Sequence, residues 1–321
     1  MTRFANPASN PFDPLFDPLV LAGNLAGALG LAAIAYGGTC LALYYFQRKL
    51  IFKPQRTILN TPADIGIPYE DVWISVNDSE SGGDGGPGHD AGHDTGKLHG
   101  WWLPNPESDQ TLLFFHGNYG NISHNLKRIH FHRNLGFSVL AIDYRGYGQS
   151  IGTDAQGQAP TEQTTYTDAS AAWHYLTKER NIAPKNITVC GHSLGGAIAI
   201  NLAIQHPHMA RLIVKSSFTT MKDAVLAKEI YSLFPVELML TEIFDSLGKV
   251  KQLQVPVLYV HGAEDPDVPA HMSQSLYEAS PEPKQLWLAP DADHNNVSAL
   301  QGDSYGKVVR SFCRGLQLQP S

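Results

Sequence analysis

The chain has 321 residues, of which 43% are hydrophobic and 17% charged. These proportions exclude a disordered polar chain, a collagen-like fibre and a small disulfide-stapled protein. Lys and Arg number 23 against 30 Asp and Glu, a formal charge of -7, so we expect no nucleic-acid partner. The three cysteines lie far apart among apolar neighbours, which fits neither a disulfide framework nor a zinc or redox pair.

The first element follows an N-terminal tail, residues 1–18, and covers residues 19–46, which contain no charged side chain. At about 1.5 Å per residue, a helix of this length spans a hydrocarbon core of about 30 Å. We therefore predict a single transmembrane anchor. Only Arg3 precedes the anchor, whereas four basic residues follow it: Arg48, Lys49, Lys53 and Arg56. By the positive-inside rule, the body after the anchor is expected in the cytoplasm.

Two other interpretations of this segment compete with the anchor. A cleaved secretory signal would use the small residues Ala33 and Ala35 as its cleavage site, but apolar sequence continues well beyond them. A buried core helix is the second alternative. The small residues at positions 23, 27, 30 and 33 also give one face that a partner helix could approach closely.

From residue 47 to the end, short apolar runs alternate with helical periodicity. The strand-like runs are 70–76, 97–104, 111–116, 137–143, 187–191, 210–217, 255–262 and 285–290. Continuous apolar strands are typical of a parallel sheet that helices cover on both faces. We therefore predict one doubly wound α/β domain over residues 47–321.

A Gly-rich insertion at residues 77–97 lies between the first two predicted strands, and its composition predicts a flexible loop. His89, Asp90, His93 and Asp94 lie in it and could in principle coordinate a metal. Because the surrounding glycines provide no rigid support for such ligands, we predict no metal site.

Residues 218–254 separate two strands and are too few for a large lid domain, so they predict a small apolar cap. Four of its apolar side chains either line an acyl groove or pack on the sheet, and both readings stay open: Phe218, Leu233, Phe234 and Leu238.

The most informative motif is GHSLGG at residues 191–196, between a predicted strand and an Ala/Ile-rich helix. G-x-S-x-G in this setting is a nucleophile elbow, a sharp turn that projects the serine above the sheet. The N-terminus of the following helix carries partial positive charge, which stabilises negative charge that develops during a reaction at the serine. We therefore predict Ser193 as a catalytic nucleophile.

A serine hydroxyl is a weak nucleophile and needs a histidine base that a carboxylate orients. Two later loops follow strands at the sheet edge where Ser193 lies, and they supply Asp265 and His294. We assign His294 as general base and then acid, and Asp265 as its orienting carboxylate. Asp267 and Glu264 are the alternatives for the acid.

Other histidines are expected to be structural or solvated. His261 lies at the end of a predicted strand and is expected to be structural. His132 belongs to a helix rich in polar residues and is expected to face solvent.

A tetrahedral intermediate also needs backbone donors for its oxyanion. One is the N–H of Leu194, directly after the nucleophile. The second is expected in the loop HGNYGN, residues 116–121, where we name Asn118, with Tyr119 as the alternative.

Several motifs together resemble the α/β-hydrolase superfamily, and more narrowly the membrane-anchored, bud-emergence-like serine hydrolases related to α/β-hydrolase-domain depalmitoylases. The resemblance covers about residues 40–315 and is carried by QRKLIFKP, HGNYGN, DYRGYGQS, GHSLGG, SSFTTMKD, FDSL, HGAEDPDVP and DADHNN. It implies a mostly parallel, twisted eight-stranded sheet with helices on both faces. It also implies the triad Ser193, Asp265 and His294, with an oxyanion donor in the HGN loop.

The resemblance places the DYRGYG loop, residues 143–148, near the pocket wall, and the alternative is an Arg–Asp pair that fixes the loop. We accordingly name Tyr144, Tyr119 and Phe218 as substrate-binding candidates. The Gly-rich insertion departs from the family pattern and could cover one rim of the site.

These observations predict a membrane-anchored serine hydrolase that forms an acyl-enzyme on an ester or thioester. Its substrate is expected to be an acylated small molecule, a lipid or an S-acylated protein, and we expect no cofactor. A serine peptidase or amidase with the same triad is the alternative, and a non-catalytic membrane scaffold is a third possibility.

Overall fold

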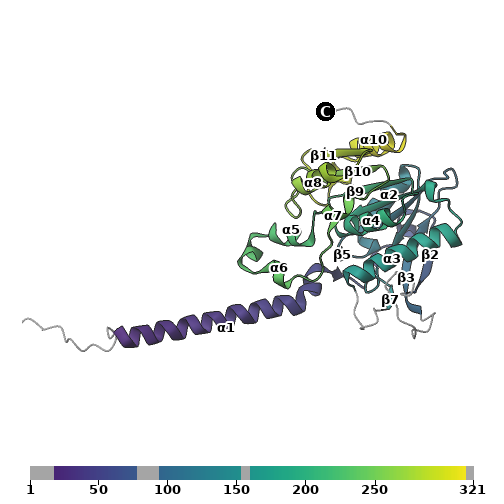
Figure 1. Ribbon diagram of the computed structural model, residues 1–321. Coiled ribbons are helices and arrows are strands. Elements are labelled where there is room, and N and C mark those ends of the chain that lie inside the picture. The colour runs from purple at the N-terminus through teal and green to yellow at the C-terminus, as the bar shows by residue number, and fades with distance from the viewer. Residues whose placement is uncertain (1–17, 78–93, 153–159, 316–321) are drawn as a thin grey trace, which may run out of the picture. The chain divides into compact units, whose positions relative to one another are not determined.

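The computed structural model describes residues 18–77, 94–152 and 160–315 (Figure 1). The chain divides into two compact units, Met1–Gln47 and Arg48–Ser321. Most of the Gly-rich insertion that we predicted at 77–97 lies outside the described residues. The side chains of the four candidate metal ligands there lie outside them as well.

The first unit contains most of helix α1 (Pro18–Ile51). Among the described residues, the apolar segment Leu19–Ile51 is the one helix whose length and composition suffice to cross a membrane. A signal sequence would meet the same criterion, so the anchor remains a prediction. The helix continues past residue 46, the predicted end of the anchor, because residues 47–51 also favour helix.

The remaining elements belong to the second unit. The strands are β1 (Lys53–Pro54), β2 (Glu70–Asn77), β3 (Asp94–Leu103), β4 (Thr111–Phe115), β5 (Tyr119–Gly120), β6 (Ser138–Ile142), β7 (Ile151–Gly152), β8 (Ile187–His192), β9 (Arg211–Lys215), β10 (Val257–Gly262) and β11 (Lys284–Ala289). The α-helices are α2 (Leu126–Asn134), α3 (Glu162–His174), α4 (Leu194–Gln205), α5 (Met221–Leu226), α6 (Val236–Met239), α7 (Ser246–Val250), α8 (His271–Ala279), α9 (Val297–Leu300) and α10 (Gly302–Cys313).

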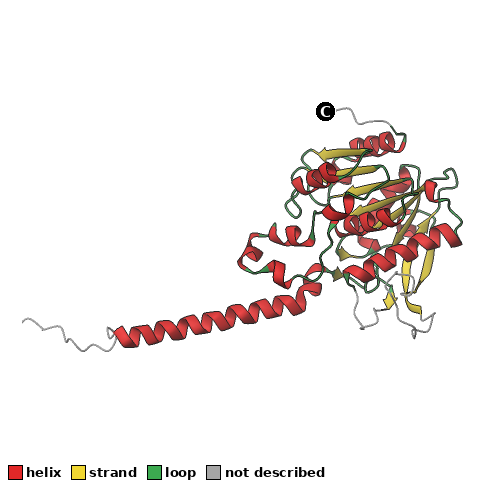
Figure 2. Ribbon diagram, viewed as in Figure 1, coloured by secondary structure: helices red, strands yellow, loops and turns green. Residues whose placement is uncertain are grey.

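The main sheet, whose strands are yellow in Figure 2, has the order β11-β10-β9-β8-β4-β6-β3-β2, and β7 pairs with β3 beside this path. The six strands from β11 to β6 run parallel, while β3 is antiparallel to both β6 and β2. The predicted mostly parallel sheet of eight strands is therefore confirmed in the described part of the chain, with the two-residue β7 as an addition.

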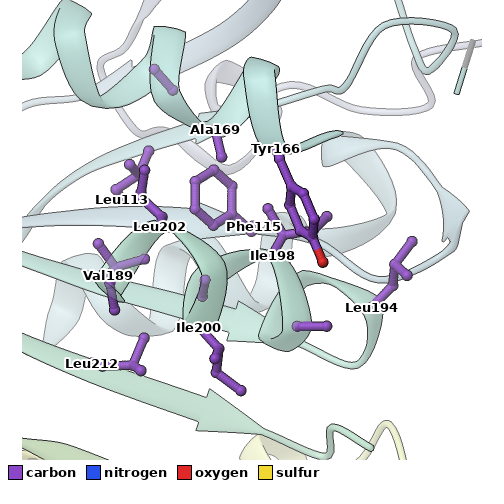
Figure 3. Packing of buried hydrophobic residues seen from close by; sticks show 14 of the residues in the cluster. Leu113, Phe115, Tyr166, Ala169, Val189, Leu194, Ile198, Ile200, Leu202 and Leu212 are labelled. Atoms are coloured by element: carbon purple, nitrogen blue, oxygen red, sulfur yellow. The ribbon is translucent and has the colours of Figure 1, made fainter. Parts of the chain in front are cut away.

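Alternate side chains of the central strands enter two different hydrophobic clusters. Leu113 and Phe115 of β4 belong to the cluster that α3 and α4 cover, whereas Leu112 and Phe114 belong to the cluster on the opposite face. Figure 3 shows the first cluster, where Ile198 and Leu202 of α4 lie among strand residues and residues of α3. Both faces of the sheet are apolar because helices cover both, as the continuous apolar runs predicted.

The parallel strands place four loops at one edge of the sheet. These loops follow the carboxyl ends of β4, β8, β10 and β11, since parallel neighbours end at the same edge. They contain the predicted oxyanion loop, the elbow, Asp265 and His294 respectively. In an open α/β sheet this edge is where sites form.

The predicted cap consists of short helical pieces. They are α5, a 3-10 helix η6 (Glu229–Leu233), α6 and α7. Helix α3 is followed directly by a single π-helical turn at Tyr175–Glu179.

Candidate active site

Ser193 sits in a strained turn between β8 and α4. Its backbone has φ 55° and ψ -119°, a left-handed conformation that a residue with a Cβ rarely adopts. The Ser193 N–H donates to the carbonyl of Lys215 over 2.8 Å, and the Ser217 hydroxyl donates to the Ser193 carbonyl over 2.9 Å. These hydrogen bonds keep the backbone in its strained conformation. Such strained residues are typical of functional sites, and here the strained residue is the predicted nucleophile.

Gly195 shows why the motif needs a glycine after the serine. A Cβ atom at this position would lie 2.3 Å from the carbonyl oxygen of Phe115, closer than non-bonded atoms approach. The first turn of α4 can therefore pack directly on β4. This contact brings the N-terminus of α4 next to the loop that follows β4.

Asp265 and His294 meet as the sequence predicted. His294 Nδ1 lies 2.7 Å from Asp265 Oδ2, and both side chains are buried. The other carboxylate oxygen, Oδ1, accepts the backbone N–H groups of Asp267 and Val268, each over 2.9 Å. Because an ionised carboxylate only accepts hydrogen bonds, His294 carries its proton on Nδ1, which leaves Nε2 as a base.

A second histidine, His261, also contacts Asp265, and the sequence reading missed it. His261 Nε2 lies 3.0 Å from Asp265 Oδ2 and 2.8 Å from the carbonyl of Val268, so this nitrogen carries the proton. Its Nδ1 accepts from the Ser273 hydroxyl over 2.6 Å. The position of His261 at the end of β10, just before the acid loop, is the sequence signal that could have identified it.

Charge on Asp265 is stabilised by these contacts. Burial raises the pKa of the Asp265 carboxyl, but hydrogen bonds from His261 and His294 lower it further than burial raises it. The net pKa lies well below its usual range, so Asp265 stays ionised throughout the neutral range.

We predict that His261→Ala lowers kcat of acyl-ester hydrolysis about 10- to 100-fold while KM changes little, because Asp265 loses an orienting donor. With one hydrogen bond fewer, the Asp265 carboxylate presents more negative charge to His294, so the acidic limb of the kcat–pH profile, which reports protonation of this base, should move to higher pH. His261→Gln places an amide N–H near the former Nε2 and should restore part of the rate. Equal losses in both variants with an unchanged pH profile would contradict the positioning role.

The loop that carries His294 is held from two sides. Asp293 Oδ1 accepts the backbone N–H groups of Asn295 and Asn296, over 2.7 and 2.9 Å. His192 Nε2 lies 3.0 Å from the carbonyl of His294 and donates to it. Burial holds the pKa of His192 well below its ordinary value, so this histidine is neutral and acts as a fixed donor.

The HGN loop lies against the nucleophile. A Cβ atom on Gly117 would come within 3.3 Å of Ser193 Cβ, so only a glycine leaves the backbone this close without displacing its neighbours. Asn118 follows directly. In the described part of the chain, neither the Asn118 N–H nor the Leu194 N–H donates to a backbone carbonyl, so both stay candidates for the oxyanion hole.

The segment after the predicted anchor positions this loop. Asn118 Nδ2 donates to the carbonyl of Ile51 over 2.8 Å, and the Lys53 N–H donates to the Asn118 carbonyl over 2.9 Å. β1 and β5 form a parallel pair in which Lys53 lies opposite Tyr119. The end of the motif QRKLIFKP therefore pairs with the loop that we predict to bind the oxyanion. The sequence alone did not indicate this pairing.

Tyr144 does not line a pocket. Its side chain has no exposed surface, and its hydroxyl donates to the carbonyl of His116 over 2.9 Å. A side chain without exposed surface cannot contact a bound acyl group. The substrate-binding role predicted for Tyr144 is therefore wrong in this conformation, and the residue supports the HGN loop from behind.

The alternative reading of the DYRGYG loop, an Arg–Asp pair, fits the structure. Arg145 donates through Nε to Asp168 Oδ1 over 2.7 Å and through its backbone N–H to Oδ2 over 2.8 Å. Both side chains are fully buried. The pair fastens the loop to α3.

The other substrate-binding candidates differ in exposure. Phe218 is 3% exposed and packs near Phe244, so it belongs to the core, and its predicted contact with substrate is not supported. Tyr119 is 57% exposed beside the HGN loop and remains a candidate. Of the open cap residues, Leu233 and Leu238 are exposed and do not pack on the sheet.

A buried polar cluster lies behind the elbow. Lys215, only 2% exposed, donates from Nζ to Ser298 Oγ over 3.0 Å, and its Nζ lies 5.2 Å from the centre of the Tyr305 ring. His132 is 2% exposed, so the prediction that it faces solvent is wrong: its helix turns this position toward the sheet. Burial lowers the pKa of His132 to about 3.

Lys215 should make stability depend on pH. Burial, aided by the positive charge of Arg128, lowers the pKa of Lys215 to about 7. Above that pH the unfolded chain binds more protons than the folded one, so the destabilisation that the buried amine causes is largest below about pH 7 and fades as pH rises from about 7 to about 10.

We predict that Lys215→Met raises the free energy of unfolding by at least about 1 kcal/mol at pH 6.5, and by less at pH 9.5. Thermal unfolding at the two pH values measures the difference, with Lys251→Met at an exposed position as control. An equal effect at both pH values would contradict burial of an ionisable amine.

Comparisons with known proteins agree with this fold. Residues 106–247 match the family Hydrolase_4, described as serine aminopeptidase, S33, a match that includes Ser193 and ends before Asp265. Protein bem46 of Schizosaccharomyces pombe is 29% identical over 313 residues, which cover 91% of this chain and 96% of that protein. The uncharacterized membrane protein YNL320W of Saccharomyces cerevisiae is 28% identical over 301 residues, covering 90% and 94%.

Among solved structures, the esterase Pf2001 of Pyrococcus furiosus superposes with a TM-score of 0.65 at 23% identity. The superposition covers 83% of this chain and 97% of the esterase chain. At this identity the likeness concerns the fold. The expected α/β-hydrolase fold and the expected similarity to bud-emergence-like proteins are confirmed.

Proposed function

Because the chain belongs to the α/β-hydrolase superfamily, with bem46-like relatives along most of its length, we propose that it is a membrane-anchored serine hydrolase of acyl esters or thioesters. One observation carries the proposal. His294 Nδ1 is bonded to a buried, ionised Asp265 at the sheet edge where Ser193 occupies a strained elbow.

In the proposed reaction, Ser193 Oγ attacks the acyl carbonyl carbon and its proton passes to His294 Nε2. The oxyanion that forms accepts hydrogen bonds from the N–H groups of Leu194 and Asn118. Collapse of the intermediate breaks the bond to the alcohol or thiol, which takes the proton from His294. Water, deprotonated by His294, then attacks the acyl-enzyme and releases the carboxylic acid.

Two features favour an acyl group presented at a membrane. The apolar helix that precedes the body is long enough to span a bilayer, and a relative carries the description membrane protein. Arg48, Lys49 and Lys53 follow the apolar run, which favours a cytoplasmic body. We therefore propose lipids or S-acylated cysteines as the substrate class.

The proposal is tested by hydrolysis of matched p-nitrophenyl esters and acyl thioesters of increasing chain length, with Ser193→Ala as the blank. A rate that rises with chain length and favours thioesters supports depalmitoylase-like activity. Activity confined to short esters would indicate a general carboxylesterase instead.

A serine peptidase is the second candidate, because the matching family is described as serine aminopeptidase. The same triad can cleave an amide. Aminoacyl p-nitroanilides, assayed beside the ester series, separate the two functions. Turnover of the anilides with no turnover of either acyl series would favour the peptidase.

A further inference from the structure

The cap exposes large apolar side chains. Within residues 230–243, which we call the cap ridge, four such side chains are exposed: Ile230 at 62%, Leu233 at 64%, Leu238 at 86% and Ile243 at 48%. Single exposed leucines are common on proteins, but several in one short segment indicate a surface that contacts something apolar.

The cap ridge is joined to the point where the body begins. Glu242 Oε1 accepts from Arg48 Nε over 2.6 Å, and the Glu242 side chain is only 4% exposed. Glu242 also accepts the backbone N–H of Glu162 at the start of α3. Arg48 is the first charged residue after the uncharged run that begins at residue 18. The ridge is therefore tied to the residue at which the body follows the apolar run in the sequence.

Two ion pairs involve charged side chains of the cap on either side of the exposed leucines. Lys222 forms an ion pair with Glu237, and Lys228 Nζ lies 2.8 Å from Asp267 Oδ1. Pairing lowers the cost of bringing a charged group toward an apolar phase, because the net charge that must lose water is smaller. The carboxylate of Glu237, next to Leu238, is thus compensated as the ridge approaches lipid, whereas the exposed Glu229 at the edge of the ridge stays in water.

Lys228 also links the cap to the triad. Its partner Asp267 donates its backbone N–H to Asp265 Oδ1 over 2.9 Å. The cap segment therefore contacts Arg48, where the body begins, at one end and the acid loop at the other.

From this arrangement we propose that the cap ridge docks on the lipid bilayer that the N-terminal helix enters. The inference rests on the membrane anchoring in the proposed function. Leu233 and Leu238 insert among the acyl chains at the interface, while Arg48 and Lys49 lie at the level of anionic headgroups. Docking holds the sheet edge that carries Ser193 at a fixed height above the lipid surface.

The test uses the full chain in phosphatidylcholine nanodiscs, with a benzophenone-bearing phenylalanine placed at position 233 or 238. Position 73 is the control, because Trp73 on β2 is 48% exposed and far from the cap in the sequence. Flotation first establishes that each variant is membrane-bound. After illumination, we expect at least five-fold more cross-linked phosphatidylcholine at 233 and 238 than at 73. Equal lipid capture at all positions, or capture of a second protein chain at 238, would overturn the proposal.

A second measurement asks whether docking serves the reaction. The double variant Leu233→Ser, Leu238→Ser should lower turnover of a long-chain acyl substrate in vesicles at least five-fold and leave turnover of a short soluble ester within two-fold. The matched control is Trp73→Ser. The role of the ridge would be contradicted if the double variant turned over both substrates as fast as the wild type does. It would also be contradicted if turnover of both substrates fell by the same factor. The cross-linking result does not depend on activity, so failure of the proposed hydrolysis is distinguishable from failure of docking.

Discussion

Ser193→Ala should abolish covalent labelling by a fluorophosphonate and lower kcat/KM for acyl-ester hydrolysis by at least about 10⁴-fold. The reason is that no acyl-enzyme can form without Oγ. The fold should persist, because Ser193 Oγ makes no hydrogen bond to another described residue and alanine can be held in the same φ 55° turn. Gel-based labelling, ester kinetics and thermal unfolding measure these three effects.

Ser217→Ala is the matched control for this variant. Ser217 is fully buried beside the elbow and donates to the carbonyl of Ser193, but it lies outside the G-x-S-x-G turn. This variant should lose some rate and still be labelled. If Ser193→Ala keeps its label, or if Ser217→Ala loses it while remaining folded, Ser193 is not the nucleophile.

Asp265→Asn should lower kcat/KM by about 10⁴-fold with little loss of structure. The carboxylate now accepts from His294 Nδ1 and from His261 Nε2 on the same oxygen. The asparagine amide keeps one oxygen that accepts hydrogen bonds, but an NH2 group replaces the other oxygen and faces N–H donors. His294 can then no longer carry its proton on Nδ1 and leave Nε2 unprotonated as the base. Steady-state kinetics and near-UV circular dichroism separate the loss of rate from loss of fold.

Asp267→Asn is the corresponding control, and it also decides between Asp265 and Asp267 as the acid. Asp267 is exposed, pairs with Lys228 and reaches Asp265 only through its backbone N–H, which the substitution keeps. An exposed ion pair contributes about 1 kcal/mol or less, so the rate should stay within about three-fold of the wild type. Should Asp267→Asn prove the more damaging of the two, the assignment of the acid would be incorrect.

The amino-acid sequence by itself determined the strand and helix pattern, the apolar N-terminal segment and the loops that carry the candidate site. These features were predictable because they depend on local order: Ser193 follows one apolar run and precedes another, and continuous apolar strands indicate a sheet covered on both faces. The pairing of His294 with Asp265 rather than Asp267 was also favoured before the structure placed them 2.7 Å apart.

Only the tertiary structure decided how residues distant in the chain meet. His261 donates to the acid because β10 ends directly beneath the acid loop, and Tyr144 is buried because it supports the HGN loop. The segment after the predicted anchor contacts that same loop across more than sixty residues of chain, as the bond from Asn118 to Ile51 shows. Such contacts depend on which strands lie side by side, and composition and periodicity carry no information about that order.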